Sequence, residues 1–479
     1  MPELFYRIPG IGIFTFLLLF QINAEAQLRY GGSSTVYAGK EGNLPFWFYA
    51  NSDGIVEPSS TNLVNGFYAY ATKRDTTIDL LFTGGFDAHG RLSADNALVF
   101  TQLFGNVTYR GIRVTAGRFY DPVGLNDDDL SMGSMLISRN ATPVPKIRVG
   151  SDGFVRVPKT GGRLQFNTML SHGWFTDNRY IDDSYLHQKF LYLKYNHRRF
   201  DVTAGMAHNT MWGGTHPGFG GGPFDLPSSL SDYFKVVFGQ SASGDKVPQN
   251  EITNAVGNSV AAYEAKLGLK FDHFRIKAYR LFYLEDKVAL RFRSPWDGLW
   301  GAGIELADDQ RIVTELLWEH MNTKRQNAWI DTPLGRNSYY NNGVYLSGWS
   351  YEGAVLGNPL LIYGPTSDFD GGLYPISNNI IVAHHIGIQG KPTDRLSYKI
   401  FLTYSRNYGT YVDQGEGPPY IPLDEIRVDE YSSLLQLEYH VAPAHGLSVT
   451  GAFAFDTGAL YEEDRLGLQV GVSWDRIAD

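Results

Sequence analysis

Hydrophobic and polar residues alternate along the last part of the chain. From Leu466 to Trp474, every second residue is apolar (Leu, Leu, Val, Val, Trp), and the residues between them are Gly, Gln, Gly and Ser. The same period of two runs through residues 396–404, 435–440 and 447–455. This period is typical of a strand with one apolar face, and about nine to eleven tilted residues suffice to cross a bilayer. We therefore expect membrane-spanning β-strands here.

Less regular strand patterns extend over the rest of the chain. We expect further strands near residues 44–51, 66–72, 78–89, 98–109, 112–120, 163–174, 189–197, 201–208, 261–271, 275–284, 301–306, 312–320 and 380–389. At one strand per ~25 residues, the chain holds roughly 18 strands, which is typical of a large barrel. The sequence shows no internal repeat, as a soluble β-solenoid would. The predicted fold is all-β: a large transmembrane antiparallel β-barrel.

The first residues of the chain are typical of a secretory signal peptide. Arg7 precedes the apolar run Ile11–Phe20, and the small-residue sequence Ala24-Glu25-Ala26 follows. The run is too short for a spanning helix. We predict that residues 1–26 are removed and that residues 27–479 form the barrel. Export together with spanning strands predicts that the protein lies in the cell outer membrane.

Three long segments interrupt the strand pattern, at about 121–158, 210–259 and 322–378. The second contains a short stretch, 230–238, in which we expect a helix. Long loops between strands are usually functional, and in a barrel they lie outside the cell or fold inward. We expect these loops to plug the mouth of the barrel.

Net charge excludes one class of partner. The chain carries a net charge of -9, so it is not basic enough for nucleic acid. An acidic glycan would have to be held by local basic residues. One basic cluster, Lys146, Arg148, Arg156 and Lys159, precedes a predicted strand, and we expect it to line the barrel wall or a periplasmic turn.

Several short motifs occur in the order seen in one known family. They are Ser138-Arg-Asn-Ala-Thr-Pro-Val-Pro-Lys-Ile147, Gly205-Met-Ala-His-Asn-Thr-Met-Trp-Gly-Gly214, Glu319-His-Met-Asn-Thr-Lys324, Tyr339-Tyr-Asn-Asn342, Gly348-Trp349, Gly357-Asn-Pro-Leu360 and Ser405-Arg-Asn-Tyr-Gly409. From about Leu44 to its C-terminus, the chain resembles the capsule-assembly Wzi family of Gram-negative outer-membrane proteins. The resemblance implies a lectin-like barrel that holds exported capsular polysaccharide at the cell surface. It also implies a periplasmic helical bundle, for which the start of this chain has no clear helical block.

Aromatic and amide side chains gather in the long loops. Flat rings suit the C–H faces of sugars, and planar amides suit their hydroxyl groups. The alternative is that these side chains pack the loops against one another inside the barrel. The candidate carbohydrate-binding residues are His208, Asn209, Trp212, His216, Tyr339, Tyr340, Asn341, Asn342 and Trp349.

Catalytic and metal-binding motifs are weak in this sequence. It contains no G-x-S-x-G elbow and no H-E-x-x-H pair. The run Asp127-Asp128-Asp129 lacks the spacing of a calcium loop, so we expect a solvated acidic turn there. We predict no catalytic residue, no metal and no cofactor.

The sequence thus predicts a monomeric, non-enzymatic barrel that binds surface or capsular polysaccharide and helps assemble or retain the capsule. Its other expected partners are outer-membrane lipid and lipopolysaccharide. Two alternatives stay open: a diffusion channel (porin), whose lumen would be continuous, and an outer-membrane hydrolase, whose catalytic groups would converge in space.

Overall fold

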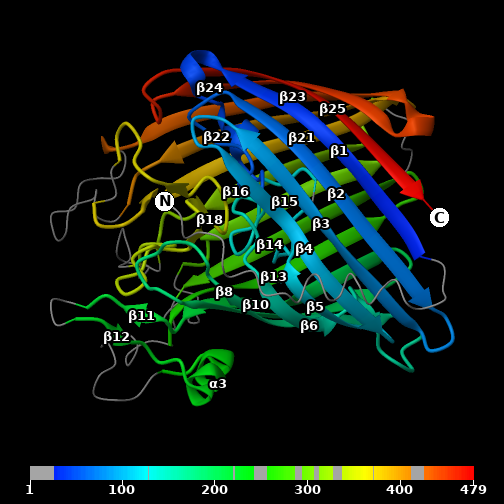
Figure 1. The fold of residues 1–479 in the computed structure, drawn as a ribbon, viewed down its shortest axis with the longest axis horizontal. Helices are drawn as coiled ribbons and strands as arrows, with labels where there is room; N and C mark the ends of the chain where they lie inside the picture. Colours follow the sequence, from blue (N-terminus) through cyan, green and yellow to red (C-terminus); the bar gives the residue numbers. More distant parts are fainter. Residues whose placement is uncertain are drawn as a thin grey trace.

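The computed structural model describes residues 26–127, 129–218, 222–241, 256–285, 294–306, 312–326, 337–369, 372–410 and 425–478. Most of these residues form the wall of a barrel (Figure 1). The wall strands are β1 (Ala26–Gly39), β2 (Asn62–Asp75), β3 (Leu80–Leu92), β4 (Ala97–Tyr109), β5 (Ile112–Arg118), β6 (Lys146–Ser151), β7 (Val155–Arg156), β8 (Leu164–Trp174), β9 (Tyr185–Asn196), β10 (Phe200–Trp212), β13 (Asn258–Lys270), β14 (Phe274–Glu285), β15 (Gly298–Leu306), β16 (Glu315–Asn322), β21 (Ile381–Thr393), β22 (Leu396–Asn407), β23 (Val428–Ala442), β24 (Leu447–Gly458) and β25 (Arg465–Ala478).

Each wall strand pairs antiparallel with its neighbours, and the first strand closes the ring. β1 pairs with β2 on one side and with β25 on the other, so that Gly39 lies opposite Gly467. The two-residue β7 pairs with β8 beyond the end of β6 and is therefore a continuation of β6. Counting β6 and β7 as one strand, the 19 strands of the sheet make a closed barrel of eighteen among the described residues. An even number is usual for such barrels.

The alternating pattern in the sequence matches the two faces of the wall. On β25, Leu468 and Val470 are 58% and 61% exposed on the outer face, whereas the neighbouring Gly467 is buried and faces inward, against Pro45 and Phe48. Exposed leucine, valine and aromatic side chains continue around the outside of the barrel. Such a surface is compatible with lipid and not with water. The predicted alternation is thus confirmed.

The two ends of the barrel differ in the length of their connections. The start of β1, the end of β25 and short turns, such as residues 110–111, 197–199 and 271–273, lie at one end. The long connections 40–61, 119–145, 213–257 and 323–380 lie at the other end. Outer-membrane barrels have short periplasmic turns and long extracellular loops, so the second end faces outward from the cell.

The connections hold short elements. These are η1 (Lys40–Gly42), α2 (Phe46–Tyr49), β11 (Thr215–His216), β12 (Phe224–Asp225), α3 (Leu230–Phe238), β17 (Ser350–Tyr351), β18 (Ala354–Val355), β19 (Ile362–Tyr363), β20 (Ile376–Asn378) and η3 (Pro443–His445). The helix expected at 230–238 is confirmed as α3, which begins with a capping box between Ser229 and Asp232. Neither α2 nor α3 is long and apolar enough to cross a membrane.

Three sequence predictions need correction or lie outside the structure. Residues 44–51 are not a strand, because the consecutive residues 46–48 of α2 are all buried, which no strand with one apolar face allows. The expected loop 121–158 ends earlier: β6 alternates Lys146 and Arg148 with the exposed Ile147 and Val149, and its charged inner face hid the strand. Residues 1–25 of the predicted signal peptide lie outside the described residues.

Candidate functional site

Three segments of the extracellular end fold into the barrel and form a plug. We define the plug as the described residues of 43–56, 121–145 and 337–363. Its apolar side chains make one continuous core with the inner face of the wall. Trp47, for example, lies 4.6 Å from the ring of Phe401 on β22, and its indole N–H donates to Thr403 Oγ1 at 3.2 Å. The plug and the wall are therefore packed as in the interior of a soluble protein.

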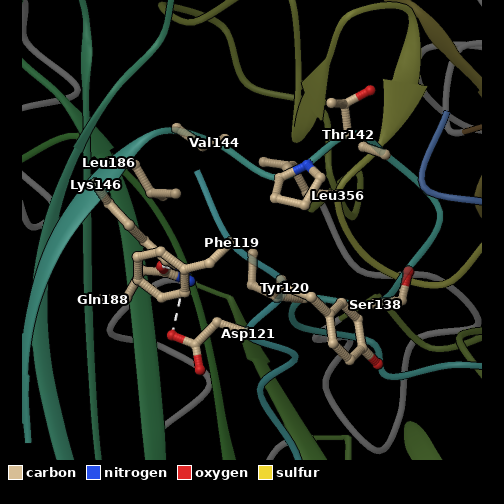
Figure 2. Close-up of a pocket in the computed structure, with 13 residues that line it drawn as sticks. Phe119, Tyr120, Asp121, Ser138, Thr142, Val144, Lys146, Leu186, Gln188 and Leu356 are labelled. Carbon is tan, nitrogen blue, oxygen red and sulfur yellow. Dashed lines mark hydrogen bonds and ion pairs between the residues drawn. The ribbon is translucent and has the colours of Figure 1, made fainter. Parts of the chain in front are cut away.

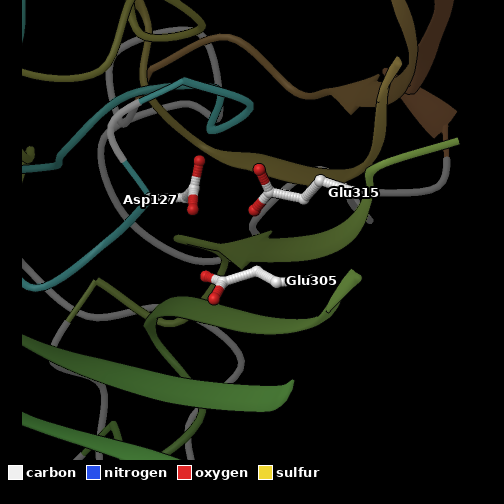
Figure 3. Close-up of side chains that lie close together, drawn as sticks. All are labelled: Asp127, Glu305 and Glu315. Atoms are coloured by element: carbon white, nitrogen blue, oxygen red, sulfur yellow. The ribbon is translucent and has the colours of Figure 1, made fainter. Parts of the chain in front are cut away.

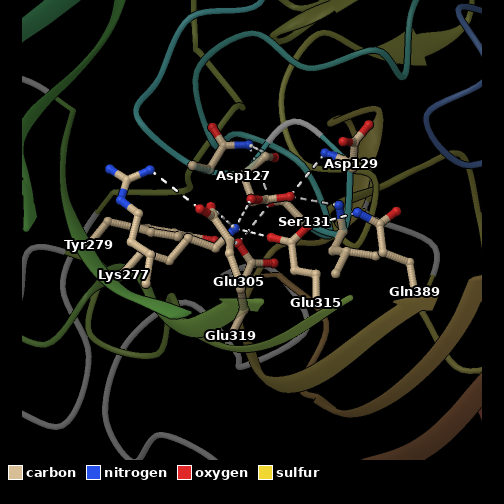
Figure 4. Close-up of polar contacts among 12 residues, drawn as sticks. Asp127, Asp129, Ser131, Lys277, Tyr279, Glu305, Glu315, Glu319 and Gln389 are labelled. Carbon is tan, nitrogen blue, oxygen red and sulfur yellow. Dashed lines mark hydrogen bonds and ion pairs between the residues drawn. The ribbon is translucent and has the colours of Figure 1, made fainter. Parts of the chain in front are cut away.

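Polar side chains on the inner wall hold the plug in place through hydrogen bonds. Glu319 of β16 accepts hydrogen bonds from the Met132 N–H and the Ser131 hydroxyl, both at 2.7 Å (Figure 4). His385 of β21 lies 2.9 Å from the Leu130 carbonyl through Nε2. Glu264 of β13 accepts from the Leu125 N–H at 2.6 Å. Wall residues from three different strands thus fix the backbone of residues 125–132.

A carboxylate cluster lies beside this contact. Asp127, Glu305 and Glu315 each place an oxygen within 4.8 Å of the others, a spacing that could suit a cation (Figure 3). The Lys277 ammonium lies among them: it is 3.0 Å from Glu305 and also pairs with Asp127 and Glu315. The Lys277 ammonium, with one positive charge, therefore already occupies the position between the three carboxylates. The Asp127 carboxylate also accepts the Asp129 and Leu130 N–H groups, so it caps a turn of the plug.

A small cavity is lined by Phe119, Asp121, Lys146 and Gln188 (Figure 2). Lys146 pairs with Asp121 at 3.3 Å and donates to Gln188 Oε1 at 2.9 Å. The cavity has a volume of about 20 Å³, which is room for about one water molecule. It is too small for a sugar. Lys146 and Arg148 both face Asp121 from the inner wall, as the wall interpretation of the basic cluster predicts.

The predicted residues Tyr339, Tyr340 and Trp349 lie in the plug and are fully buried. The Trp349 indole N–H donates to the Leu136 carbonyl at 2.8 Å, and the Tyr340 hydroxyl donates to the Met135 carbonyl at 2.6 Å. The backbone N–H of Trp349 donates to the Tyr340 carbonyl at 2.7 Å. Tyr340 and Trp349 thus join the 121–145 and 337–363 segments.

Tyr339 also contacts a buried carboxyl group. Its hydroxyl lies 2.8 Å from Asp297 Oδ2, and the Arg325 and Gln326 N–H groups donate to the same carboxylate. Burial nevertheless raises the pKa of the Asp297 carboxyl to about 7, because the hydrogen bonds only partly offset the loss of water. Asn341 and Asn342 stabilise the neighbouring turns: Asn341 Nδ2 donates to the Ile376 carbonyl, and Asn342 Oδ1 accepts the Val344 N–H.

The remaining predicted residues lie on or beside β10 and do not converge with the first group. His208 and Trp212 are on the outer face of β10, whereas Asn209 faces inward and accepts a hydrogen bond from Gln188 Nε2 at 3.2 Å. His216 of β11 stacks on Phe224 at 4.8 Å, and its Nδ1 accepts the Gly218 N–H. A direct glycan contact by any of the nine residues stays a prediction.

A much larger groove opens at the extracellular end. It has a volume of about 730 Å³ and lies between the 40–59 connection, the 352–367 segment and the β24–β25 turn. Sequence reasoning missed it, because the lining comes from five separate parts of the chain. Its lining includes Lys40, Glu41, Asn43, Tyr49, Glu57, Arg91, Asp95, Asn140, Glu352, Tyr363, Tyr461, Glu462, Glu463, Asp464 and Arg465.

Three tyrosines give the groove its aromatic surface. Tyr363 is 41% exposed. Tyr49 and Tyr461 lie with their hydroxyl oxygens 3.2 Å apart, and the Arg465 guanidinium stacks 3.5 Å above the centre of the Tyr461 ring. Burial raises the pKa of Tyr49, so its hydroxyl stays neutral and can donate a hydrogen bond.

The groove is also acidic. Its lining carries seven carboxylates and three cationic side chains, which is a net charge of -4. Lys40 pairs with Glu463 at 3.2 Å and Arg91 with Asp95 at 3.2 Å. A groove with exposed rings, amides and carboxylates can hold a chain of hydroxyl groups, and its charge disfavours a polyanion.

The sequence model of a family described as Capsule assembly protein Wzi matches residues 46–364, which is 319 of the 479 residues. The chain belongs to the Wzi family. The resemblance in the sequence motifs is thereby confirmed. No curated protein sequence matches the chain.

The fold is similar to that of a solved outer-membrane barrel. Wzi from Escherichia coli, described as a carbohydrate-binding β-barrel involved in group 1 capsule assembly, matches with a TM-score of 0.57 and 12% identity over 98% of this chain and 89% of its own. OprD from Pseudomonas aeruginosa matches with a TM-score of 0.45 and 10% identity over 95% and 98%. Family membership and the closed barrel with an apolar outer face make this Wzi-family chain an outer-membrane protein.

Proposed function

We propose that this protein binds exported polysaccharide at the cell surface and helps to assemble or retain a capsule. The observation that carries the proposal is the extracellular groove of about 730 Å³ above a plugged barrel. A groove of this size accommodates several sugar units, and it opens to the side from which a capsule would be retained. The family description and the carbohydrate-binding Wzi barrel of Escherichia coli support the same function.

The packed interior argues against the alternative of a diffusion channel. A porin needs a continuous water-filled lumen, but here the plug and inner wall share one apolar core. We propose that Tyr339, Tyr340 and Trp349 act as positioning residues, because they hold the segment that continues into the groove wall. The Tyr340 hydroxyl, for instance, accepts the Asn358 N–H at 3.0 Å, five residues before Tyr363.

We also propose that binding occurs without catalysis and that the protein acts as a monomer. The ring closes within one chain, so no second copy is needed to satisfy a sheet edge. Its apolar outer wall contacts outer-membrane lipid and lipopolysaccharide.

A glycan array tests the binding function. We expect the folded protein to retain polysaccharides and Tyr363→Ala to weaken retention about tenfold, which is about 1.4 kcal/mol for one lost ring contact. The matched control is Tyr109→Ala, because Tyr109 has a similar exposure of 43% but lies at the periplasmic end. Equal retention by the wild type and the Tyr363 variant would exclude the groove as the polysaccharide-binding site. A steady conductance of the wild type in planar bilayers would favour the porin instead.

A further inference from the structure

The short helix α3 lies outside the barrel, against the extracellular part of its wall. Figure 1 shows α3 beyond the edge of the wall, next to β8 and β10. One side of the helix packs on the wall: the Tyr233 ring lies 5.7 Å from Trp212 of β10 and 5.4 Å from His187 of β9. Val236 is buried in the same apolar cluster as Trp212.

The wall beneath α3 faces outward and is unusually polar. On β9, Leu191 and Leu193 are 51% and 50% exposed on the outer face, and the same face continues toward the extracellular end with Lys189 and His187. His187 is fully buried although it points out of the barrel. Lys189 donates to the Val236 carbonyl of α3 at 3.3 Å and lies 2.9 Å from His208 Nδ1. The helix therefore covers polar groups that would otherwise face lipid.

The opposite side of α3 is apolar and exposed. Leu230, Phe234 and Phe238 are 73%, 53% and 70% exposed, and their spacing of four residues places them in one stripe. The two charged side chains of the helix, Asp232 and Lys235, pair with each other at 2.8 Å. Three large apolar side chains in a row are costly in water.

We propose that α3 is an interfacial helix, which seals the polar outer wall of β8–β10 and inserts Leu230, Phe234 and Phe238 among the acyl chains of the outer leaflet. Lys189, which contacts Val236 of α3, lies on the same outer face of β9 as the exposed Leu191 and Leu193, two and four residues further along the strand. The helix therefore lies over a wall face that becomes apolar toward the bilayer. An amphipathic helix with one apolar face lies in the plane of the membrane interface. The helix thereby anchors the 213–257 connection to the bilayer. This inference is independent of the polysaccharide groove.

Spin labelling tests the proposal directly, because the chain has no cysteine. Phe234→Cys is labelled with a nitroxide, and the protein is reconstituted into dioleoylphosphatidylcholine vesicles. Collisions with apolar oxygen and with a water-soluble nickel chelate are then compared. Leu191→Cys serves as the lipid-facing control and Glu463→Cys as the aqueous control. We expect the oxygen-to-nickel ratio at residue 234 to match that at 191 and to exceed that at 463 several-fold.

Two results would overturn the proposal. A ratio equal to that at residue 463 would place the stripe in water. Low access to both reagents would mean that another protein surface, such as a second copy, covers it. Folding is checked for every variant by its shift in electrophoretic mobility on heating, and Leu230→Cys repeats the measurement if Phe234→Cys does not fold.

Discussion

Glu319 and Met132 lie far apart in the sequence, yet the carboxylate of Glu319 accepts the backbone N–H of Met132 at 2.7 Å inside the barrel. The other oxygen of Glu319 accepts the hydroxyls of Ser131 at 2.7 Å and of Tyr279 at 2.5 Å. Glu319 is fully buried. A buried carboxylate with three donors is a strong contact, and removing it leaves all three donors without a partner.

Loss of this contact should loosen the plug. We expect Glu319→Ala to lower the free energy of unfolding by about 2–4 kcal/mol, because a hydrogen-bonded charged group is lost from the interior. The plug should also open from time to time, so that openings appear in single-channel recordings in planar bilayers, where the wild type is expected to be silent.

Glu438→Ala is the control for that experiment, because Glu438 also lies on the inner face of a wall strand but its side chain is 37% exposed. We expect it to change neither stability nor conductance. If Glu319→Ala were as stable and as silent as Glu438→Ala, the wall contacts would not be what holds the plug.

A glycine on the inner wall allows the plug to approach closely. A Cβ atom at Gly387 of β21 would lie 2.8 Å from both the Leu130 carbonyl oxygen and its Cβ. We expect Gly387→Ala to cost about 1–3 kcal/mol through overpacking, measured as a lower unfolding temperature. Gly451→Ala is the matched control, since a Cβ there meets no atom within 4 Å. Equal unfolding temperatures for the two variants would contradict the close packing.

The wall could be predicted from the sequence because each strand has its own alternating pattern. Leu466 to Trp474 shows one face for lipid and one for the interior, and β25 follows it. The alternating pattern does not reveal β6, because the inner face of that strand is charged. It also wrongly predicts a strand at Phe46–Phe48, because this short apolar run packs inside the plug. Period alone cannot separate a lipid-facing residue from one that packs inside the barrel.

The groove could not be predicted, because it depends on contacts between distant segments. Tyr49 and Tyr461 are more than 400 residues apart, and only the closure of β1 on β25 brings their loops together. Tyr340 and Trp349 stood out in the sequence because tyrosine and tryptophan suit sugars, but the same residues also suit a packed core with a polar edge. Their burial in the plug follows from tertiary contacts that no local pattern reports.

The Asp297 carboxyl makes the plug sensitive to pH. Its pKa in the folded protein is about 7, above the ordinary value of 3.8, so the folded state binds more protons than the unfolded state between these values. The contribution of Asp297 to the free energy of unfolding is therefore greatest below pH 4. It falls as the pH rises toward 7, by at most about 1.4 kcal/mol per pH unit. Thermal unfolding between pH 4 and 8 should show this loss in the wild type and a smaller loss in Asp297→Asn. Parallel pH profiles would contradict the raised pKa.

The acidity of the groove predicts which polysaccharides it prefers. With seven carboxylates against three cations, it should bind neutral chains such as dextran more tightly than polyanions such as alginate. Glu462→Gln with Asp464→Asn removes two negative charges and leaves the Lys40–Glu463 pair intact. We expect this double variant to bind alginate several-fold more tightly at low salt, and dextran unchanged, by calorimetry.

The control for the double variant carries the same change of charge at the periplasmic end. Glu438→Gln with Asp272→Asn lies far from the groove, since Asp272 is in the β13–β14 turn and Glu438 is near the periplasmic end of β23. If both double variants gained alginate binding equally, net charge and not the groove would set the preference. If salt did not reduce the gain in the groove variant, the effect would not be electrostatic, because exposed charges more than about 10 Å apart are screened at 0.1 M salt.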